Sequence, residues 1–249
     1  MQEAPDRAKM REFLAAQVDP DGLRTVLDLG CGRGADLDLL ARRLPAASRL
    51  IGLDNSPSAI EAARAAARDD RLEFIEGDAA KELPYANGEI DLVYSVNFLE
   101  CVEDKQSALA EIARVLRPAG QIICGHFDWD SIAINGLNKA LTRKVVHAYA
   151  DWRQAWMADS DGWMGRRLWA EFGRSGRYKG RIESYVLTNA DYCEPFYGHG
   201  YVQGCAGLVR NGKISEDEYD AFVHGLQRLA DKGEYFFGAT MYAYVGTKV

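Results

Sequence analysis

Short apolar runs alternate with stretches of helical periodicity over the first 130 residues of the chain. The runs lack the two-residue alternation of a strand with one exposed face, as expected when helices cover both faces of a parallel sheet. This order of elements predicts βαβ units and an open α/β sheet. The predicted strands are Thr25–Leu29, Leu50–Leu53, Leu72–Ile75, Ile90–Val96 and Gln121–Cys124.

Capping and turn residues place helices between these strands. Ser56 can cap a helix that has Pro57 in its first turn, which predicts a helix over the Ala-rich segment Ser58–Arg68. A second helix is expected from Asp104 to Leu116, where the helical spacing stops before Arg117-Pro118-Ala119-Gly120.

The pattern changes between Asp130 and about Gly180, where aromatic, charged and glycine residues are mixed. We expect one or two helices over Asn135–Met157 and another over Met164–Phe172. Residues 130–180 are predicted to form a helical insertion that lies over the carboxyl edge of the sheet and acts as a lid. Its glycines would let it move.

The last part of the chain returns to regular elements, with a strand at Arg181–Thr188, an amphipathic helix at Ser215–Leu229 and a strand at Tyr235–Val245. The expected fold is therefore one domain, residues 1–249. We predict a Rossmann-like open sheet of about seven strands, mostly parallel with an antiparallel last strand, with helices on both faces.

Composition narrows the class of protein. A net charge of −7 argues against a large nucleic-acid footprint, and the apolar runs are too short to span a membrane. The N-terminal stretch Met1–Arg7 has no apolar segment of signal-peptide type. Five scattered cysteines favour neither a disulfide framework nor a metal site. We therefore expect a cytoplasmic monomer or homodimer that holds no metal and whose partner is a small molecule.

The strongest chemical signal is a glycine-rich turn that follows the first predicted strand. Gly30, Gly32 and Gly34 allow a tight turn and a close approach of a ligand to the backbone, whose N–H groups at the helix start can bind a nucleotide. Gly30, Gly32 and Ala35 also fit the dinucleotide pattern, so an NAD-binding domain stays an alternative.

Three acidic residues at strand ends favour another ligand. Asp28 lies inside the first strand, where a buried carboxylate needs a cationic partner such as a ligand ammonium group. Asp54 ends the second strand and can accept hydrogen bonds from ribose hydroxyls. Dinucleotide-binding domains share this acid, so it indicates a ribose without identifying the cofactor. Asp78 follows the third strand, and it is either a turn residue or an acceptor for the exocyclic amine of adenine.

Taken together, these residues resemble the class I methyltransferases that use S-adenosylmethionine (SAM), in particular the small-molecule group that includes quinone-biosynthesis enzymes. The resemblance covers about residues 20–127. It rests on Leu27-Asp28-Leu29-Gly30-Cys31-Gly32-Arg33-Gly34, Gly52-Leu53-Asp54-Asn55-Ser56, Glu76-Gly77-Asp78-Ala79, Phe98-Leu99-Glu100-Cys101-Val102-Glu103-Asp104 and Glu111-Ile112-Ala113-Arg114-Val115-Leu116-Arg117-Pro118-Ala119-Gly120.

The resemblance implies methyl transfer from SAM to an O, N or C atom of a small acceptor, aromatic or a secondary metabolite, with S-adenosylhomocysteine as product. Gly30 to Gly34 would cradle the methionine and ribose, and Asp54, with Asn55 beside it, would hold the ribose. Asp78 and Ala79 would contact adenine, and Asn97 would lie beside the methionine end. Many relatives carry histidine at the position of Cys101, where a buried apolar filler is expected here.

Candidate catalytic bases follow the fifth strand. Strand alternation sends His126 and Asp128 to the same side, and each is either a proton acceptor or a structural residue. Candidate acceptor contacts are aromatic or polar-aromatic side chains. Trp152 and Trp156, four apart, would share a helical face, which packing on the sheet also explains. The full set is Trp129, Trp152, Trp156, Tyr192, Tyr197 and His199.

Three hypotheses follow. The leading one is a small-molecule methyltransferase, and the second is an NAD-dependent dehydrogenase, against which Asp28 argues. The third is a SAM-binding protein without catalysis, whose cofactor motifs would be the same.

Overall fold

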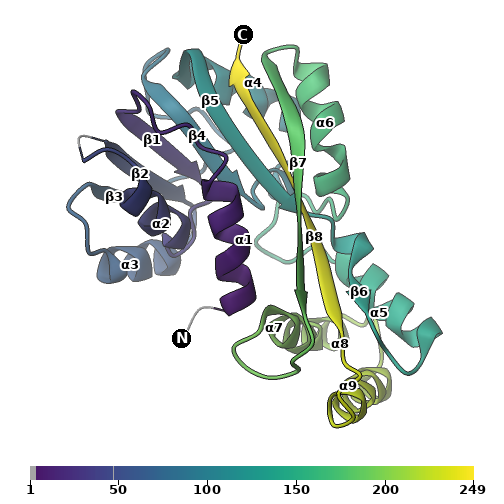
Figure 1. Cartoon of the computed structure of the whole chain (residues 1–249). Coiled ribbons are helices and arrows are strands. Elements are labelled where there is room, and N and C mark those ends of the chain that lie inside the picture. The colour runs from purple at the N-terminus through teal and green to yellow at the C-terminus, as the bar shows by residue number, and fades with distance from the viewer. Residues whose placement is uncertain (1–3, 47) are drawn as a thin grey trace.

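Eight strands form one sheet in the computed structural model, which describes residues 4–46 and 48–249 (Figure 1). Residues 1–3, the start of the N-terminal stretch considered above, and residue 47 lie outside the described part. Five strands run parallel in the order β3-β2-β1-β4-β5. Their bounds are β1 (Thr25–Leu29), β2 (Arg49–Asp54), β3 (Leu72–Glu76), β4 (Ile90–Val96) and β5 (Leu116–Phe127).

Three more strands complete the sheet, and all of their pairs are antiparallel. The last strand, β8 (Phe237–Lys248), pairs with β5 on one side and along its whole length with β7 (Tyr178–Asn189) on the other. The two-residue strand β6 (Ala133–Ile134) pairs with β8 beyond the end of β5. The predicted open sheet with an antiparallel last strand is confirmed. Its shortest strand was missed because two residues establish no period.

The helix before β5 ends where it was predicted to end, but Arg117-Pro118-Ala119-Gly120, which follows it, belongs to the strand β5. The helix α4 (Lys105–Val115) leads directly into β5, and a bulge absorbs the extra residues: Ile90 pairs with Leu116, whereas Leu92 pairs with Gln121. Such a bulge leaves residues unpaired, so it tolerates Pro118, which has no N–H to donate.

Side chains along the parallel strands alternate between two apolar layers. Val26 packs with the helices on one face, whereas Leu27 packs with those on the other. The first face carries α1 (Pro5–Ala15), α2 (Ala35–Arg43) and α3 (Pro57–Ala66), and the second carries α4 and α6 (Met164–Ser175). By this alternation Asp28 faces α1 and α2, on the same side as Val26. Helices therefore cover both faces, as predicted.

The segment of residues 130–180 does not form one helical unit. It begins with the short 3-10 helix η2 (Trp129–Ser131), and the expected helices over Asn135–Met157 reduce to α5 (Lys139–Ala150). Residues 151–162 are irregular, so the expectation that Trp152 and Trp156 share a helical face is wrong. The indoles, polar neighbours and Gly162 of this stretch break the apolar period that a helix would need. The helix α6 packs on the sheet, where Phe172 stacks on Tyr244 with ring centroids 3.9 Å apart.

Three helices connect β7 to β8. The predicted helix is confirmed as α9 (Glu216–Ala230), and Ser215 and Glu218 form a capping box at its start. The preceding helices α7 (Tyr197–Gly204) and α8 (Ala206–Arg210) were not predicted, because glycine is frequent in that segment. Among the described residues, no helix is both long and apolar enough to cross a membrane.

Candidate functional site

A cavity of about 540 Å³ opens where β1, β2, β3 and β4 end. This is the edge at which open α/β sheets bind their ligands. It brings together six of the nine predicted cofactor residues: Gly30, Asp54, Asn55, Asp78, Ala79 and Asn97. Ser56, Ala80, Phe98, Cys101, Val102, Trp156 and Ala158 complete its lining.

The glycine-rich turn is shaped by backbone bonds to the neighbouring strand. Gly30 and Cys31 both donate their N–H to the carbonyl oxygen of Leu53, at 2.8 and 3.2 Å. Gly34 has a φ of 79°, and a Cβ added there would lie 2.5 Å from the ring of Phe74. The left-handed conformation and the close ring together require glycine at this position. Gly32 and Gly34 are not part of the cavity lining, because they lie further along the turn.

Asp54 links the turn to the second strand. Its Oδ2 accepts the N–H of Gly32 at 2.8 Å, and its Oδ1 accepts the N–H of Ser56 at 2.9 Å. A carboxylate has about four acceptor sites, so each oxygen keeps a lone pair for a ligand hydroxyl. Two backbone bonds thus hold the side chain in place before any ligand arrives.

Asp78 makes a turn contact and also lines the cavity. Its Oδ1 accepts the N–H of Ala80 at 3.0 Å, which is a turn contact. It lies 3.4 Å from Nζ of Lys81 as an exposed ion pair, and it also lines the cavity beside Ala79. The turn therefore positions a carboxylate at the cavity wall.

Asp28 is buried behind the cavity and does not line it. The side chain is 2% exposed, and its Oδ2 has no hydrogen-bond partner. Burial raises the pKa of Asp28 well above its usual range, and the charges of Asp36 and Asp54 raise it further, against an opposing effect of Arg11. Of the three strand-end aspartates, Asp54 and Asp78 therefore line the cavity and Asp28 does not. A ligand cation would supply the partner that the Asp28 carboxylate lacks.

Asn97 joins the ends of β4 and β5. Its φ of 57° lies in the left-handed region, which asparagine tolerates better than most residues. Its N–H donates to the carbonyl of Gly125 at 2.9 Å, and its Oδ1 accepts the N–H of Phe127 at 3.1 Å. The side chain is fixed by these bonds at the cavity edge.

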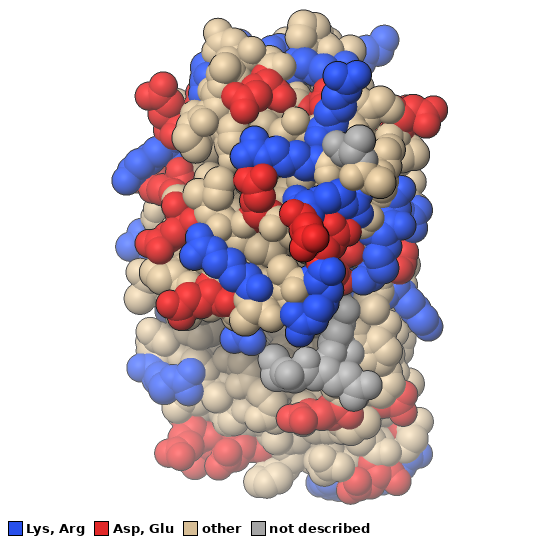
Figure 2. Space-filling model, turned by 90° about the vertical axis from the view of Figure 1, so that its left-hand side faces the viewer, with Lys and Arg blue, Asp and Glu red and all other residues tan. Residues whose placement is uncertain are grey.

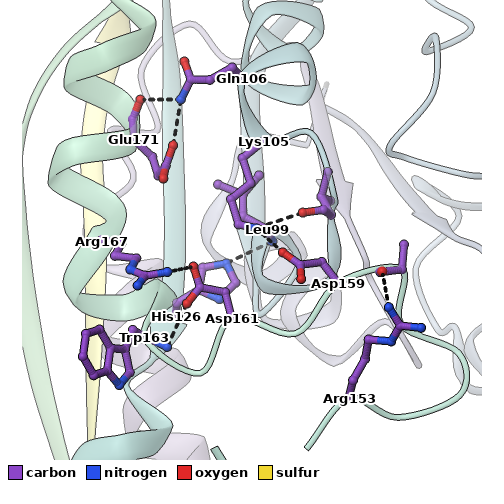
Figure 3. Close-up of polar contacts among 12 residues, drawn as sticks. Leu99, Lys105, Gln106, His126, Arg153, Asp159, Asp161, Trp163, Arg167 and Glu171 are labelled. Carbon is purple, nitrogen blue, oxygen red and sulfur yellow. Dashed lines mark hydrogen bonds and ion pairs between the residues drawn. The ribbon is translucent and has the colours of Figure 1, made fainter. Parts of the chain in front are cut away.

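The two candidate bases lie outside the cavity lining. His126 is fully buried, and its Nε2 accepts the N–H of Leu99 at 3.1 Å, so the ring proton of the neutral form is on Nδ1 (Figure 3). Asp128 is 2% exposed, and its two carboxylate oxygens accept hydrogen bonds from Nε and Nη2 of Arg166. A base must come within hydrogen-bond reach of the acceptor. Both residues are occupied by protein groups here, and their catalytic role stays a prediction.

Of the predicted acceptor contacts, Trp129 and Tyr197 pack around the ring of Phe127 in an aromatic cluster. The Trp129 and Tyr197 rings lie 5.0 and 5.3 Å from the Phe127 ring, and Tyr149 lies 5.6 Å from Trp129. Tyr192 and His199 contact each other, with ring centroids 5.2 Å apart. Burial raises the pKa of Tyr197 to about 12, so its hydroxyl stays protonated at neutral pH. Trp152 packs against Tyr149, whereas Trp156 is separate and lines the cavity.

Buried Glu100 was missed by the sequence analysis. Its Oε2 accepts the indole N–H of Trp129 at 2.6 Å and lies 3.8 Å from Nδ1 of His126. Its only signal in the sequence is its place in the quoted segment after the fourth strand. Ala158 was missed as well, and no local pattern marks it.

A larger cavity of about 670 Å³ lies elsewhere, between η2, β6 and α5. Its lining includes Asp130, Lys139, Arg143 and His147 but no predicted cofactor residue. Size alone therefore does not identify the site. The glycine turn and the strand-end acids point to the smaller cavity.

Comparisons with known proteins agree with this geometry. The sheet has the Rossmann-like form of methyltransferase folds. A family model described as "Methyltransferase domain" matches residues 27–124, so this part of the chain is similar to that domain. The resemblance inferred from the sequence is confirmed.

Two curated relatives are similar over part of the chain. Phthiotriol/phenolphthiotriol dimycocerosates methyltransferase from Mycobacterium leprae is 35% identical over 58% of this chain and 56% of that protein. Trans-aconitate 2-methyltransferase from an Azoarcus species is 34% identical over 47% of this chain and 44% of that protein. The chain thus spans about half the length of the curated relatives it matches.

Solved structures extend the likeness over the whole fold. The YcgJ protein from Bacillus subtilis is 17% identical with a TM-score of 0.63, over 97% of this chain and 98% of that one. Geranyl diphosphate C-methyltransferase from Streptomyces coelicolor, solved with Mg²⁺, geranyl diphosphate and S-adenosylhomocysteine, is 16% identical with a TM-score of 0.56. That match covers 98% of this chain and 79% of that one. At these identities the likeness establishes the fold.

Proposed function

We propose that this protein transfers a methyl group from SAM to an O, N or C atom of a small-molecule acceptor. The observation that carries the proposal is the shared cavity of Asp54 and Asp78 at adjacent strand ends, with Asp54 held in place by the glycine-rich turn. In this arrangement two carboxylates are one strand apart, so one can meet a ribose while the other meets an adenine amine.

The residues present fit this cofactor. Asp54 would accept from the ribose hydroxyls, and Asp78 with the Ala79 backbone would contact adenine. The orphaned Oδ2 of Asp28 would accept a hydrogen bond from the methionine ammonium, a group that a nicotinamide dinucleotide does not have. This difference favours SAM over NAD.

When bound, SAM supplies a methyl group on a sulfonium, which is an excellent leaving group. The protein's task is therefore to hold donor and acceptor in line and to keep water out, and positioning of this kind can lower a barrier by about 7–11 kcal/mol. A side-chain base is required only if the acceptor atom must lose a proton.

We place the acceptor against the aromatic cluster around Phe127. Asn97 lines the donor cavity, and its Oδ1 accepts the backbone N–H of Phe127, whose ring belongs to the cluster. Flat apolar rings suit an aromatic or isoprenoid-like acceptor. The proposed contacts are Trp129, Trp152, Tyr192, Tyr197 and His199.

The named relatives act on small molecules such as trans-aconitate and geranyl diphosphate. A small acceptor also agrees with the surface charge. On the face in Figure 2, basic and acidic side chains are interspersed rather than gathered into a basic stripe. Nucleic-acid binding depends on such clustered cations.

Calorimetric titration of the full chain tests the cofactor. We expect heat on adding SAM or S-adenosylhomocysteine and none on adding NAD, and the reverse would overturn the proposal. Incubation with SAM and a pool of small metabolites should then yield S-adenosylhomocysteine. Binding of SAM without product over a broad acceptor panel would favour the non-catalytic alternative.

A further inference from the structure

Residues 151–162, which we call the rim loop, are fastened to the segment that follows β4. The N–H of Asp159 donates to the carbonyl of Cys101 at 3.1 Å, and that of Asp161 donates to the carbonyl of Glu100 at 3.2 Å. Nζ of Lys105 donates to Oδ2 of Asp159 at 2.7 Å and to the carbonyl of Val102 at 2.9 Å (Figure 3). The rim loop is thus tied to the donor cavity's own wall.

Further bonds give the rim loop a defined shape. Inside it, Nη1 of Arg153 donates to the carbonyl of Ala158 at 3.3 Å, and Oγ of Ser160 donates to that of Trp152 at 3.3 Å. At its end, Oδ2 of Asp161 lies 2.8 Å from Nη1 of Arg167 on α6 (Figure 3). Burial raises the pKa of Asp159, but the hydrogen bonds from Lys105 and from the Ser160 backbone, with the charges of Lys105 and Arg153, together leave that pKa below its usual value. The ion pair is therefore formed at neutral pH.

Trp156 presents its indole at the cavity. The side chain is 62% exposed although it lines the cavity with Ala158, and its Nε1 bonds to Oε1 of Gln154 within the same loop. Most of the side chain is therefore accessible to a flat partner. An exposed large aromatic in a concave site is typical of ligand contact.

The other lining residues indicate which part of a ligand this indole meets. The cavity contains Asp54, Asn55, Asp78 and Ala79, which belong to the adenosine half of the predicted cofactor site. Gly30 and Asn97, which are expected near the methionine, also line it, whereas Asp28, Gly32 and Gly34 do not. The aromatic cluster proposed for the acceptor is likewise outside it.

We propose that Trp156 is a donor-binding residue that packs its indole on the adenine of the bound nucleoside, and that the Lys105–Asp159 pair positions it. The inference rests on the proposed function and assigns Trp156 to the donor rather than to the acceptor. Stacking of a base on an aromatic side chain is tolerant of the exact ring placement, which suits a residue on a loop.

Titration of the full chain with S-adenosylhomocysteine and with 5′-methylthioadenosine tests the assignment. The second ligand has the adenine but no amino-acid part, so a residue that packs on the adenine should affect both ligands alike. Both should lose about tenfold in affinity in Trp156→Ala. Trp156→Phe should keep most of the affinity. Trp169→Ala is the matched control, since Trp169 is 60% exposed on α6 and outside the cavity, and it should bind as the wild type does.

The positioning role has its own readout. Lys105→Met should weaken methylthioadenosine binding by about two- to fivefold, and Lys105→Arg should restore it. In a Trp156→Ala background, Lys105→Met should have no further effect, because the pair acts through the indole. Thermal unfolding of each variant shows whether a loss of affinity comes with a general loss of stability.

Two results would overturn the inference. Unchanged affinity of Trp156→Ala for both nucleosides, with the wild type and Asp54→Ala behaving as proposed, would remove Trp156 from the donor site and leave the proposed function standing. If the wild-type chain binds neither nucleoside, both this inference and the proposed function are wrong.

Discussion

Gly32 donates its backbone N–H to Oδ2 of Asp54 over 2.8 Å, so the glycine-rich turn after β1 and the acid that ends β2 form one rigid unit. The N–H of Ser56 holds the other carboxylate oxygen. The acceptor geometry for a ribose is therefore set before a ligand binds, which reduces the ordering cost of binding.

Replacing Asp54 with alanine should weaken SAM binding by about 10–150-fold, equivalent to about 1.5–3 kcal/mol, because a bidentate carboxylate acceptor is lost. Calorimetry with the full chain measures the change. Glu76→Ala is the matched control, since Glu76 ends β3 but does not line the cavity. Equal affinity of Asp54→Ala and the wild type would show that the ribose binds elsewhere.

Asp28→Asn should make the free protein more stable at pH 7 and weaken SAM binding. The raised pKa of Asp28 means that its ionisation costs more in the folded state than in the unfolded chain. Its favourable contribution is complete below the unfolded pKa of about 4 and is lost as the pH rises through the folded pKa. The stability gain of Asp28→Asn should thus be small at pH 4 and larger at pH 7, as measured by urea unfolding. A gain independent of pH would contradict this account.

Gly34→Ala should lower the free energy of unfolding by about 2 kcal/mol. Alanine is strained by about 1 kcal/mol in the left-handed conformation, and its Cβ would meet the Phe74 ring at 2.5 Å. Gly173→Ala is the control in α6, where nothing lies within 4 Å of an added Cβ. That variant should gain about 0.5–1 kcal/mol from helix propensity, and urea denaturation measures both. A neutral Gly34→Ala would mean that the turn relaxes freely.

His126→Leu should lower the free energy of unfolding by about 1–3 kcal/mol, because the buried N–H of Leu99 loses its acceptor. SAM binding should be retained and turnover reduced. His126→Gln offers an acceptor again and should recover most of the stability. If both turnover and stability recover in His126→Gln, His126 acts by positioning the segment after β4. If stability recovers in that variant but turnover stays low and its pH profile changes, proton transfer by His126 is supported.

Much of the fold was predictable because its signals are local. The strand at Thr25–Leu29, the Ser56 cap and the helix after Ser215 follow from apolar runs and capping residues that need no distant partner. The same holds for Asp54 and Asp78, since parallel strands end at one edge of the sheet. Prediction failed where a segment has no period of its own, as at residues 151–162 and at the glycine-rich start of α7.

The sequence by itself determined the parallel sheet, the glycine-rich turn and the identity of the acids at its carboxyl edge, because spacing along the chain is sufficient to define them. Only the tertiary structure decided that Asp28 is buried and does not line the cavity, and that His126 accepts the N–H of Leu99. It also decided that Trp156 lines the same cavity as Asp54 and Asp78, on a loop that the ion pair between Lys105 and Asp159 ties to the segment after β4. Such contacts join segments far apart in the chain, and they depend on how whole layers pack rather than on any local pattern.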